Sequence, residues 1–134
     1  MQNPSDGKTA LGLDLNIGAG ICYVGNLVCS LGLIYSIIVI VTDKTNKLPR
    51  FHAFQSILLL AANLIILLPG YLIVGVLFAM QSSITMILGG IVGLIVAVIG
   101  LALFVFFIIS AIKAFQGQIY KVPVIGNYAD NLSN

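Results

Sequence analysis

Residues 51–112 read FHAFQSILLLAANLIILLPGYLIVGVLFAMQSSITMILGGIVGLIVAVIGLALFVFFIISAI, sixty-two residues without one Asp, Glu, Lys or Arg. Soluble domains carry about a quarter of their residues as charged ones, so this stretch is not typical of a water-soluble fold. A charged side chain at the centre of a bilayer costs roughly 2.5–3.5 kcal/mol on insertion scales. The chain keeps its charges near its ends and in one short loop. This pattern predicts an integral membrane protein.

Apolar segments of sufficient length to cross a bilayer as helices occur three times. A hydrocarbon core of about 30 Å needs about 20 residues of helix, and each segment exceeds that length. A basic loop separates the first segment from the second, and the polar turn Gln81-Ser82-Ser83 separates the second from the third. The predicted spans are residues 17–41, 51–80 and 84–112.

The predicted fold class is all-α, with three transmembrane helices in one membrane domain that covers residues 1–134 and an interfacial tail over residues 113–134. Five of the six Lys and Arg residues lie in the basic loop or the tail, and Lys8 alone precedes the first span. Positive charge favours the cytoplasm, so we expect the N-terminus outside and the C-terminus in the cytoplasm, in a bacterial cytoplasmic (inner) membrane. A parse with four spans, broken at Pro69-Gly70, divides the basic residues three against three and is disfavoured.

Small residues recur at helical spacing in the first and third spans. Such series let helix backbones approach closely where lipid provides no hydrophobic drive for association. The two faces can serve packing within the protein or contact with another subunit, and the sequence leaves both uses open. The residues are Gly18, Cys22, Gly25, Cys29 and Gly32 in the first span, and Gly89, Gly93, Ala97 and Gly100 in the third.

A cluster of polar residues marks the start of the second span. Arg50 is placed to reach lipid phosphates, and His52 and Gln55 share one helix face. One interpretation is a site at the cytoplasmic mouth, in which His52 carries protons or binds a pigment or haem as axial ligand. The other, which we favour, is an interfacial cluster hydrogen-bonded to the neighbouring loop or tail. No cofactor or metal is required, although contact with a pigment, carotenoid or quinone stays open.

The tail contains more apolar and aromatic residues than a solvated terminus needs. Tyr120 and Lys121 suit the head-group region, and Pro123 disfavours a regular helix through this part. We therefore expect a bent segment that docks through Phe115, Tyr120, Lys121 and Pro123 on the membrane or on a partner. Residues 127–134 are expected to be loose.

Two motifs resemble those of a known family. Residues 46–56, NKLPRFHAFQS, resemble the Arg-Phe-His-Ala-x-Gln-Ser signature of a widespread family of small bacterial membrane proteins of unknown function. Residues 111–126, AIKAFQGQIYKVPVIG, are similar to that family's closing pattern, and Gly12-Leu13-Asp14 fits its usual opening. The resemblance extends to the channel-associated component of the protein import machinery in the chloroplast inner envelope. It implies helices that line or support a translocation path.

The chemistry of the side chains disfavours several classes of function. With one His, four Asp and no Glu, the sequence offers no general acid and base pair, so we expect no enzyme. The basic residues are too scattered for a nucleic-acid surface. Cys22 and Cys29 would lie about 10 Å apart on a helix and could not form a disulfide.

The predicted function is a non-enzymatic accessory or structural subunit that packs onto a larger membrane protein complex. Its expected partners are the lipid bilayer and other membrane protein subunits, without nucleic acid. The alternatives are a component of a translocation path for proteins or small solutes, and a pigment-binding subunit.

Overall fold

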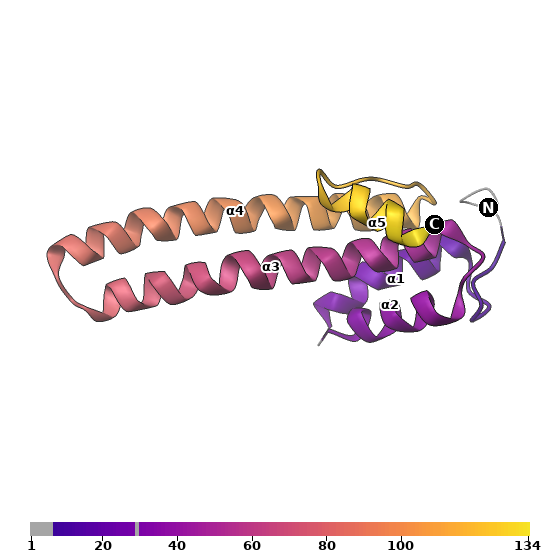
Figure 1. Ribbon diagram of the computed structural model, residues 1–134, viewed down its shortest axis with the longest axis horizontal. Helices are drawn as coiled ribbons and strands as arrows, with labels where there is room; N and C mark the ends of the chain where they lie inside the picture. Colours follow the sequence, from indigo (N-terminus) through magenta and orange to yellow (C-terminus); the bar gives the residue numbers. More distant parts are fainter. Residues whose placement is uncertain (1–6, 29) are drawn as a thin grey trace. The chain divides into compact units, whose positions relative to one another are not determined.

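The computed structural model describes residues 7–28 and 30–134, and this part of the chain folds into five helices (Figure 1). The prediction of an all-α fold is confirmed. Contacts divide the chain into two compact units: unit 1 comprises Met1–Leu59 and Phe106–Asn134, and unit 2 comprises Leu60–Val105. The helices are α1 (Leu15–Leu27), α2 (Leu31–Thr42), α3 (Lys47–Ala79), α4 (Ser83–Phe115) and α5 (Ile125–Ser133).

The two long helices, α3 and α4, correspond to the second and third expected spans. Each has 33 residues, and both are long and apolar enough to cross a membrane. Their length follows from the sequence, because the apolar run is interrupted only at Gln81-Ser82-Ser83, where the described chain turns between them. Pro69 lies inside α3 without ending it.

The prediction of one helix over residues 17–41 is wrong. The segment forms α1 and α2, of 13 and 12 residues, and Ser30 between them adopts a left-handed backbone conformation with φ 60°. Asn26 and Ser30 are weak helix formers in this apolar run, since their side chains compete for backbone hydrogen bonds. Length and apolar character do not distinguish one long helix from two short ones. Cys29 lies outside the described residues.

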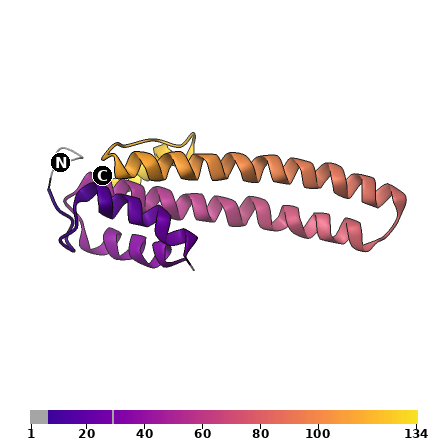
Figure 2. The ribbon, with the colours of Figure 1, turned by 180° about the vertical axis from the view of Figure 1, so that it is seen from behind.

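Helices α1 and α2 form a hairpin, here called the short hairpin, in which they lie side by side (Figure 2). Its contact rests on glycine: a Cβ atom added to Gly25 would lie 2.7 Å from the Cα of Gly32. A Cβ atom on Gly32 would collide with backbone atoms of Asn26 and Cys22. Two of the small residues expected to form one face of a single helix therefore face each other across the turn.

The segment before α1 contacts the loop between α2 and α3. The backbone N–H of Ala10 donates to Asp43 Oδ2 at 3.2 Å, and Asn46 Nδ2 donates to the carbonyl oxygen of Lys8 at 3.0 Å. This arrangement differs from the expectation that Lys8 and the basic loop lie on opposite sides of a membrane. The difference follows from the turn after α1, because α2 runs back along α1 and its end lies near the start of α1.

The end of α4 redirects the chain into the tail. Gly117 has φ +72°, its N–H donates to the carbonyl of Ala114, and the N–H of Gln118 donates to that of Lys113. This pair of bonds is a Schellman motif, in which glycine takes the left-handed position at no steric cost. Residues 118–122 are thereby turned back toward the start of α3.

Unit 2, Leu60–Val105, contains parts of α3 and α4 with the turn between them and carries no charged residue. Small residues of α4 face α3: Cβ atoms added to Gly89 and Gly100 would lie 3.3 Å and 3.5 Å from side-chain atoms of Leu77 and Leu67. Gly70 of α3 faces Val96 in the same way. Most of the large apolar side chains around this contact are exposed, which is the surface that a hydrocarbon environment favours.

Candidate functional site

His52 is the centre of a buried polar cluster in unit 1, and its side chain is completely inaccessible. Its Nε2 lies 2.9 Å from the carbonyl oxygen of Gln118, and its Nδ1 lies 2.9 Å from the hydroxyl of Tyr23. Because a carbonyl oxygen can only accept, Nε2 carries the proton and donates. In the neutral ring Nδ1 then accepts, and the Tyr23 hydroxyl donates to it. Both ring nitrogens are engaged within the protein.

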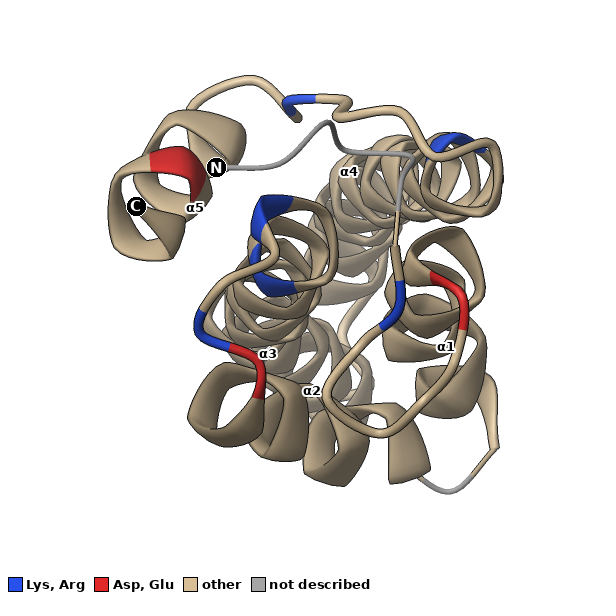
Figure 3. Cartoon of the chain, turned by 90° about the vertical axis from the view of Figure 1, so that its right-hand side faces the viewer, with Lys and Arg blue, Asp and Glu red and all other residues tan. Residues whose placement is uncertain are grey.

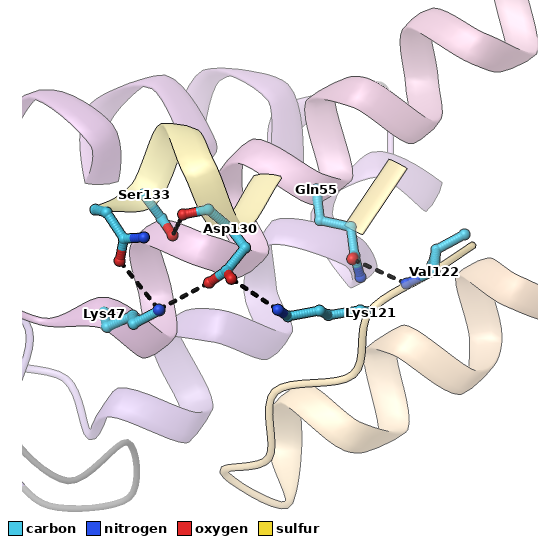
Figure 4. A network of polar contacts seen from close by, with 7 residues as sticks. Lys47, Gln55, Lys121, Val122, Asp130 and Ser133 are labelled. Atoms are coloured by element: carbon cyan, nitrogen blue, oxygen red, sulfur yellow. Dashed lines mark hydrogen bonds and ion pairs between the residues drawn. The ribbon is translucent and has the colours of Figure 1, made fainter. Parts of the chain in front are cut away.

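Gln55 lies one turn further along α3 and is also completely buried. Its Nε2 lies 3.0 Å from the Tyr23 hydroxyl, 3.0 Å from the carbonyl oxygen of Tyr120 and 3.2 Å from Ser110 Oγ, so two N–H donors are shared among three acceptors. Its Oε1 accepts from the N–H of Val122 at 3.2 Å (Figure 4). One side chain therefore joins α1, α4 and the tail to α3.

These contacts define what we call the tail clasp: the side chains of Tyr23, His52, Gln55 and Ser110 with the backbone of residues 118–122. Aromatic contacts support it. The ring of Tyr23 meets those of His52 and Phe107 edge to face, with centroids 5.5 Å and 5.6 Å apart. Edge-to-face pairs at this distance stabilise by about 0.5–1.5 kcal/mol beyond area burial.

Two further residues of the motif join α2 to α3. The hydroxyls of Ser56 and Ser36 lie 2.9 Å apart in a buried contact. Arg50 donates from Nη1 to the carbonyl oxygen of Ile40 at 3.2 Å, near the end of α2, where carbonyls have no helical partner. The guanidinium of Arg50, expected to reach lipid phosphates, thus serves as a helix cap.

The last part of the tail forms α5, which corrects the expectation that residues 127–134 are loose. Asp130 accounts for its position, because its two carboxylate oxygens pair with Lys47 and Lys121, each at 2.7 Å (Figure 4). Lys47 also donates to Asn134 Oδ1 at 3.0 Å. Pro123 does precede the helix, which begins only at Ile125.

Acidification is expected to loosen α5. Hydrogen bonds from Lys121, and then from Lys47, lower the pKa of Asp130. A carboxyl group whose pKa is lower in the folded state stabilises the fold above its unfolded pKa of about 3.9, and this contribution is lost as the pH falls through the folded value. Ion pairs that remain in contact with solvent, as these do, contribute up to roughly 1 kcal/mol each. We expect faster hydrogen exchange in residues 125–133 below pH of about 3.9 than at pH 7.

Asp130→Asn provides the control for this prediction. At pH 7 the variant should show the faster exchange of the acidified protein, and its exchange in α5 should depend less on pH after correction for intrinsic rates. Equal protection of α5 in the parent protein at both pH values, after the same correction, would contradict the assignment of Asp130 as its anchor.

The remaining predicted residues are distributed over both units. Cys22 is buried and Phe115 lies against Gly20, both in unit 1. A Cβ atom on Gly18 would lie 2.7 Å from Thr9. In unit 2, Gly93 lies near Val74, and Ala97 is exposed.

The expected tail-docking residues contact the protein in different ways. Tyr120 does so through its carbonyl oxygen, Lys121 through its ammonium group and Phe115 through its ring, whereas Pro123 is exposed.

Sequence reasoning missed half of the tail clasp. Tyr23 and Ser110 were not identified, nor were Asp130 and Lys47 as the anchor of α5. The available signal was the isolation of these polar groups: a hydroxyl inside an apolar run must find a partner when it is buried. The sequence did not indicate which partner.

The tail clasp joins segments of the same chain, and the polar atoms of His52 and Gln55 are already engaged in hydrogen bonds within it. Coordination of a pigment or haem by His52 would require the loss of its bond to either Tyr23 or Gln118. Among the described residues, no group of three His, Cys, Asp or Glu side chains could hold a metal ion. The described acidic residues Asp14, Asp43 and Asp130 each have a cationic or hydrogen-bonding partner.

Comparison with known proteins gives a consistent result. The model of the magnetosome magnetite crystal formation protein family matches residues 14–129. UPF0132 membrane protein MJ1443 of Methanocaldococcus jannaschii is 32% identical over 127 residues, covering 95% of this chain and 96% of the relative. UPF0132 membrane protein MJ1527 of the same organism is 32% identical over 122 residues, covering 90% and 71%. No solved structure matches the chain.

Proposed function

The chain belongs to the magnetosome magnetite crystal formation protein family, with relatives named as membrane proteins, and we propose that it is a non-enzymatic structural subunit of a larger membrane protein assembly. The family description concerns the formation of magnetite crystals. In a process of that kind, this chain would supply membrane structure to an assembly and would not supply ligands to iron.

The tail clasp is the observation that carries this proposal. A catalytic or transport site needs polar atoms that face a substrate, whereas the polar atoms of His52 and Gln55 face other parts of the same chain. The residues of the most distinctive motif therefore build a packed module. In the proposed assembly, this packed module would present fixed surfaces to neighbouring subunits.

Unit 2 has the length and the apolar surface expected of a membrane anchor. The helical stretches 60–79 and 83–105 rise about 30 Å and 35 Å at 1.5 Å per residue, which matches a hydrocarbon core of about 30 Å. Their exposed side chains are almost all aliphatic or aromatic. All six Lys and Arg residues belong to unit 1 (Figure 3), so the positive-inside rule favours the cytoplasmic side of an inner membrane for the basic loop and the tail.

Unit 2 also offers a face for a helix of another subunit. Cβ atoms added to Gly75 of α3 and Gly90 of α4 would meet nothing within 4 Å, so neither glycine is needed for packing inside unit 2. Glycine costs about 1 kcal/mol relative to alanine in a helix. Close approach of a foreign helix, as in small-residue membrane interfaces, would give these positions a use.

Extraction of the tagged full-length chain from its native membranes in a mild detergent should yield co-purifying subunits in fixed stoichiometry. Gly90→Leu should weaken that association several-fold, because the added side chain blocks close approach, while thermal stability in detergent should not fall, because leucine is a better helix former than glycine. Ile91→Leu, at a neighbouring exposed position, is the matched control and should leave the association intact. A single protomer without neighbours, after cross-linking in intact membranes, would contradict the proposal.

A further inference from the structure

The short hairpin presents an apolar surface that nothing in the described chain covers. Its exposed side chains come from both helices and from the turn, where Leu27, Val28 and Leu31 are 61%, 55% and 54% exposed. Further exposed residues on the two helices are Ile17, Val24, Ile34, Ile37, Ile38 and Val41. A surface of this extent on a chain that enters a membrane requires an apolar environment.

The helices are too short to cross a bilayer. At 1.5 Å per residue, α1 and α2 rise about 20 Å and 18 Å. That length falls short of a hydrocarbon core of about 30 Å but exceeds the half that belongs to one leaflet. The hairpin could therefore enter one leaflet and return.

The start of α1 and the end of α2 lie close together, held by hydrogen bonds between polar groups. The segment before α1 and the loop after α2 are joined by the bonds from Ala10 to Asp43 and from Asn46 to Lys8. The turn at the other end has no charged residue, and two of its described N–H groups pair locally: that of Val28 donates to the carbonyl of Gly25, and that of Leu31 donates to the carbonyl of Val28. Backbone that pairs within itself is the condition for entry into lipid.

From these observations we infer that the short hairpin is a re-entrant element, embedded in the acyl chains of a single leaflet with its turn inside the bilayer. The inference rests on the proposed membrane anchoring of α3 and α4. It places the N-terminal segment, the basic loop and the tail on one side of the membrane, so that all six Lys and Arg residues share the cytoplasmic side. The positive-inside rule favours this arrangement over one that leaves Lys8 opposite the others.

Site-directed labelling tests the inference on the full chain. In a parent with Cys22→Ala and Cys29→Ala, single cysteines are placed at exposed positions by Ala10→Cys, Thr45→Cys, Ser82→Cys and Val28→Cys. A membrane-impermeant maleimide is applied to intact cells and to permeabilised ones. We expect Ser82→Cys to react in intact cells and Ala10→Cys and Thr45→Cys only after permeabilisation, with Val28→Cys reacting at least ten-fold more slowly than any of them until detergent is added.

The outcomes are distinguishable. Reaction of Ala10→Cys together with Ser82→Cys in intact cells would restore a first helix that crosses the membrane and would overturn the inference. Rapid reaction of Val28→Cys from either aqueous side would also overturn it. Release of the protein from membranes by alkaline carbonate would instead show that it is not an integral membrane protein, and the proposed function itself would then fail.

A second measurement distinguishes whether lipid or protein covers the turn of the short hairpin. The purified chain, with an environment-sensitive fluorophore on Val28→Cys, is reconstituted into vesicles that contain nitroxide-labelled lipids. Quenching by nitroxides placed along the acyl chains is expected to exceed quenching by nitroxides at the head group. A protected fluorophore that no lipid nitroxide quenches would mean that protein covers the turn, and this result would overturn the inference.

Discussion

Gln55→Leu is expected to release the tail from unit 1. Leucine preserves the size of the side chain but leaves the carbonyl oxygen of Tyr120 and the N–H of Val122 without their partner. Each buried polar group that loses its hydrogen bond costs about 1–3 kcal/mol, so the expected loss of stability for the two groups is roughly 2–6 kcal/mol. Thermal unfolding in detergent measures the loss, and limited proteolysis within residues 118–134 locates it.

Gln116→Leu provides a matched control for the loss of the tail. Gln116 is exposed just after the end of α4, so the same chemical change removes no buried contact. The control should melt within about 0.5 kcal/mol of the parent. If Gln55→Leu behaved like this control, the tail clasp would not hold the tail.

Gly32→Ala is expected to force the two helices of the short hairpin apart. The added methyl group would collide with the backbone N of Asn26 and would lie 2.7 Å from the carbonyl oxygen of Cys22. Backbone atoms cannot move aside as a flexible side chain can, so the cost should reach the upper end of the roughly 1–3 kcal/mol measured for overpacking, despite the better helix propensity of alanine. Thermal unfolding and proteolysis at residues 28–31 measure it.

Gly75→Ala tests the same chemical change where space is open. Nothing lies within 4 Å of a Cβ atom at this position, so alanine should stabilise α3 by up to about 1 kcal/mol. The two substitutions are therefore expected to have opposite signs. A neutral Gly32→Ala would show that α1 and α2 do not approach as closely as the structure indicates.

The long helices could be predicted from the sequence because an unbroken apolar run of this length leaves few alternatives. The short hairpin could not. Its turn interrupts an apolar segment with only Asn26 and Ser30 as polar markers, and the backbone hydrogen bonds of its described residues are local. Hydropathy is the same for one long helix and for two short ones, and the difference lies in glycine contacts between residues that adjoin only after folding.

The tail clasp illustrates a second limit. The sequence indicated that His52 and Gln55 share a helix face, and favoured a contact with the loop or the tail. It did not provide the partner atoms, because these are backbone groups of residues 118–122, and backbone groups are the same at every position. The helix after Pro123 was missed for a related reason, since an ion pair with Lys47, distant in sequence, stabilises it.

The connectivity of the tail clasp makes the module depend on the order of synthesis. His52 and Gln55 leave the ribosome early, yet the groups that complete their bonding follow 65–67 residues later, after both long helices. Until then the side chains of His52 and Gln55 lack the backbone partners that residues 118–122 provide. A chain truncated before residue 118 would therefore leave these polar groups without those hydrogen bonds.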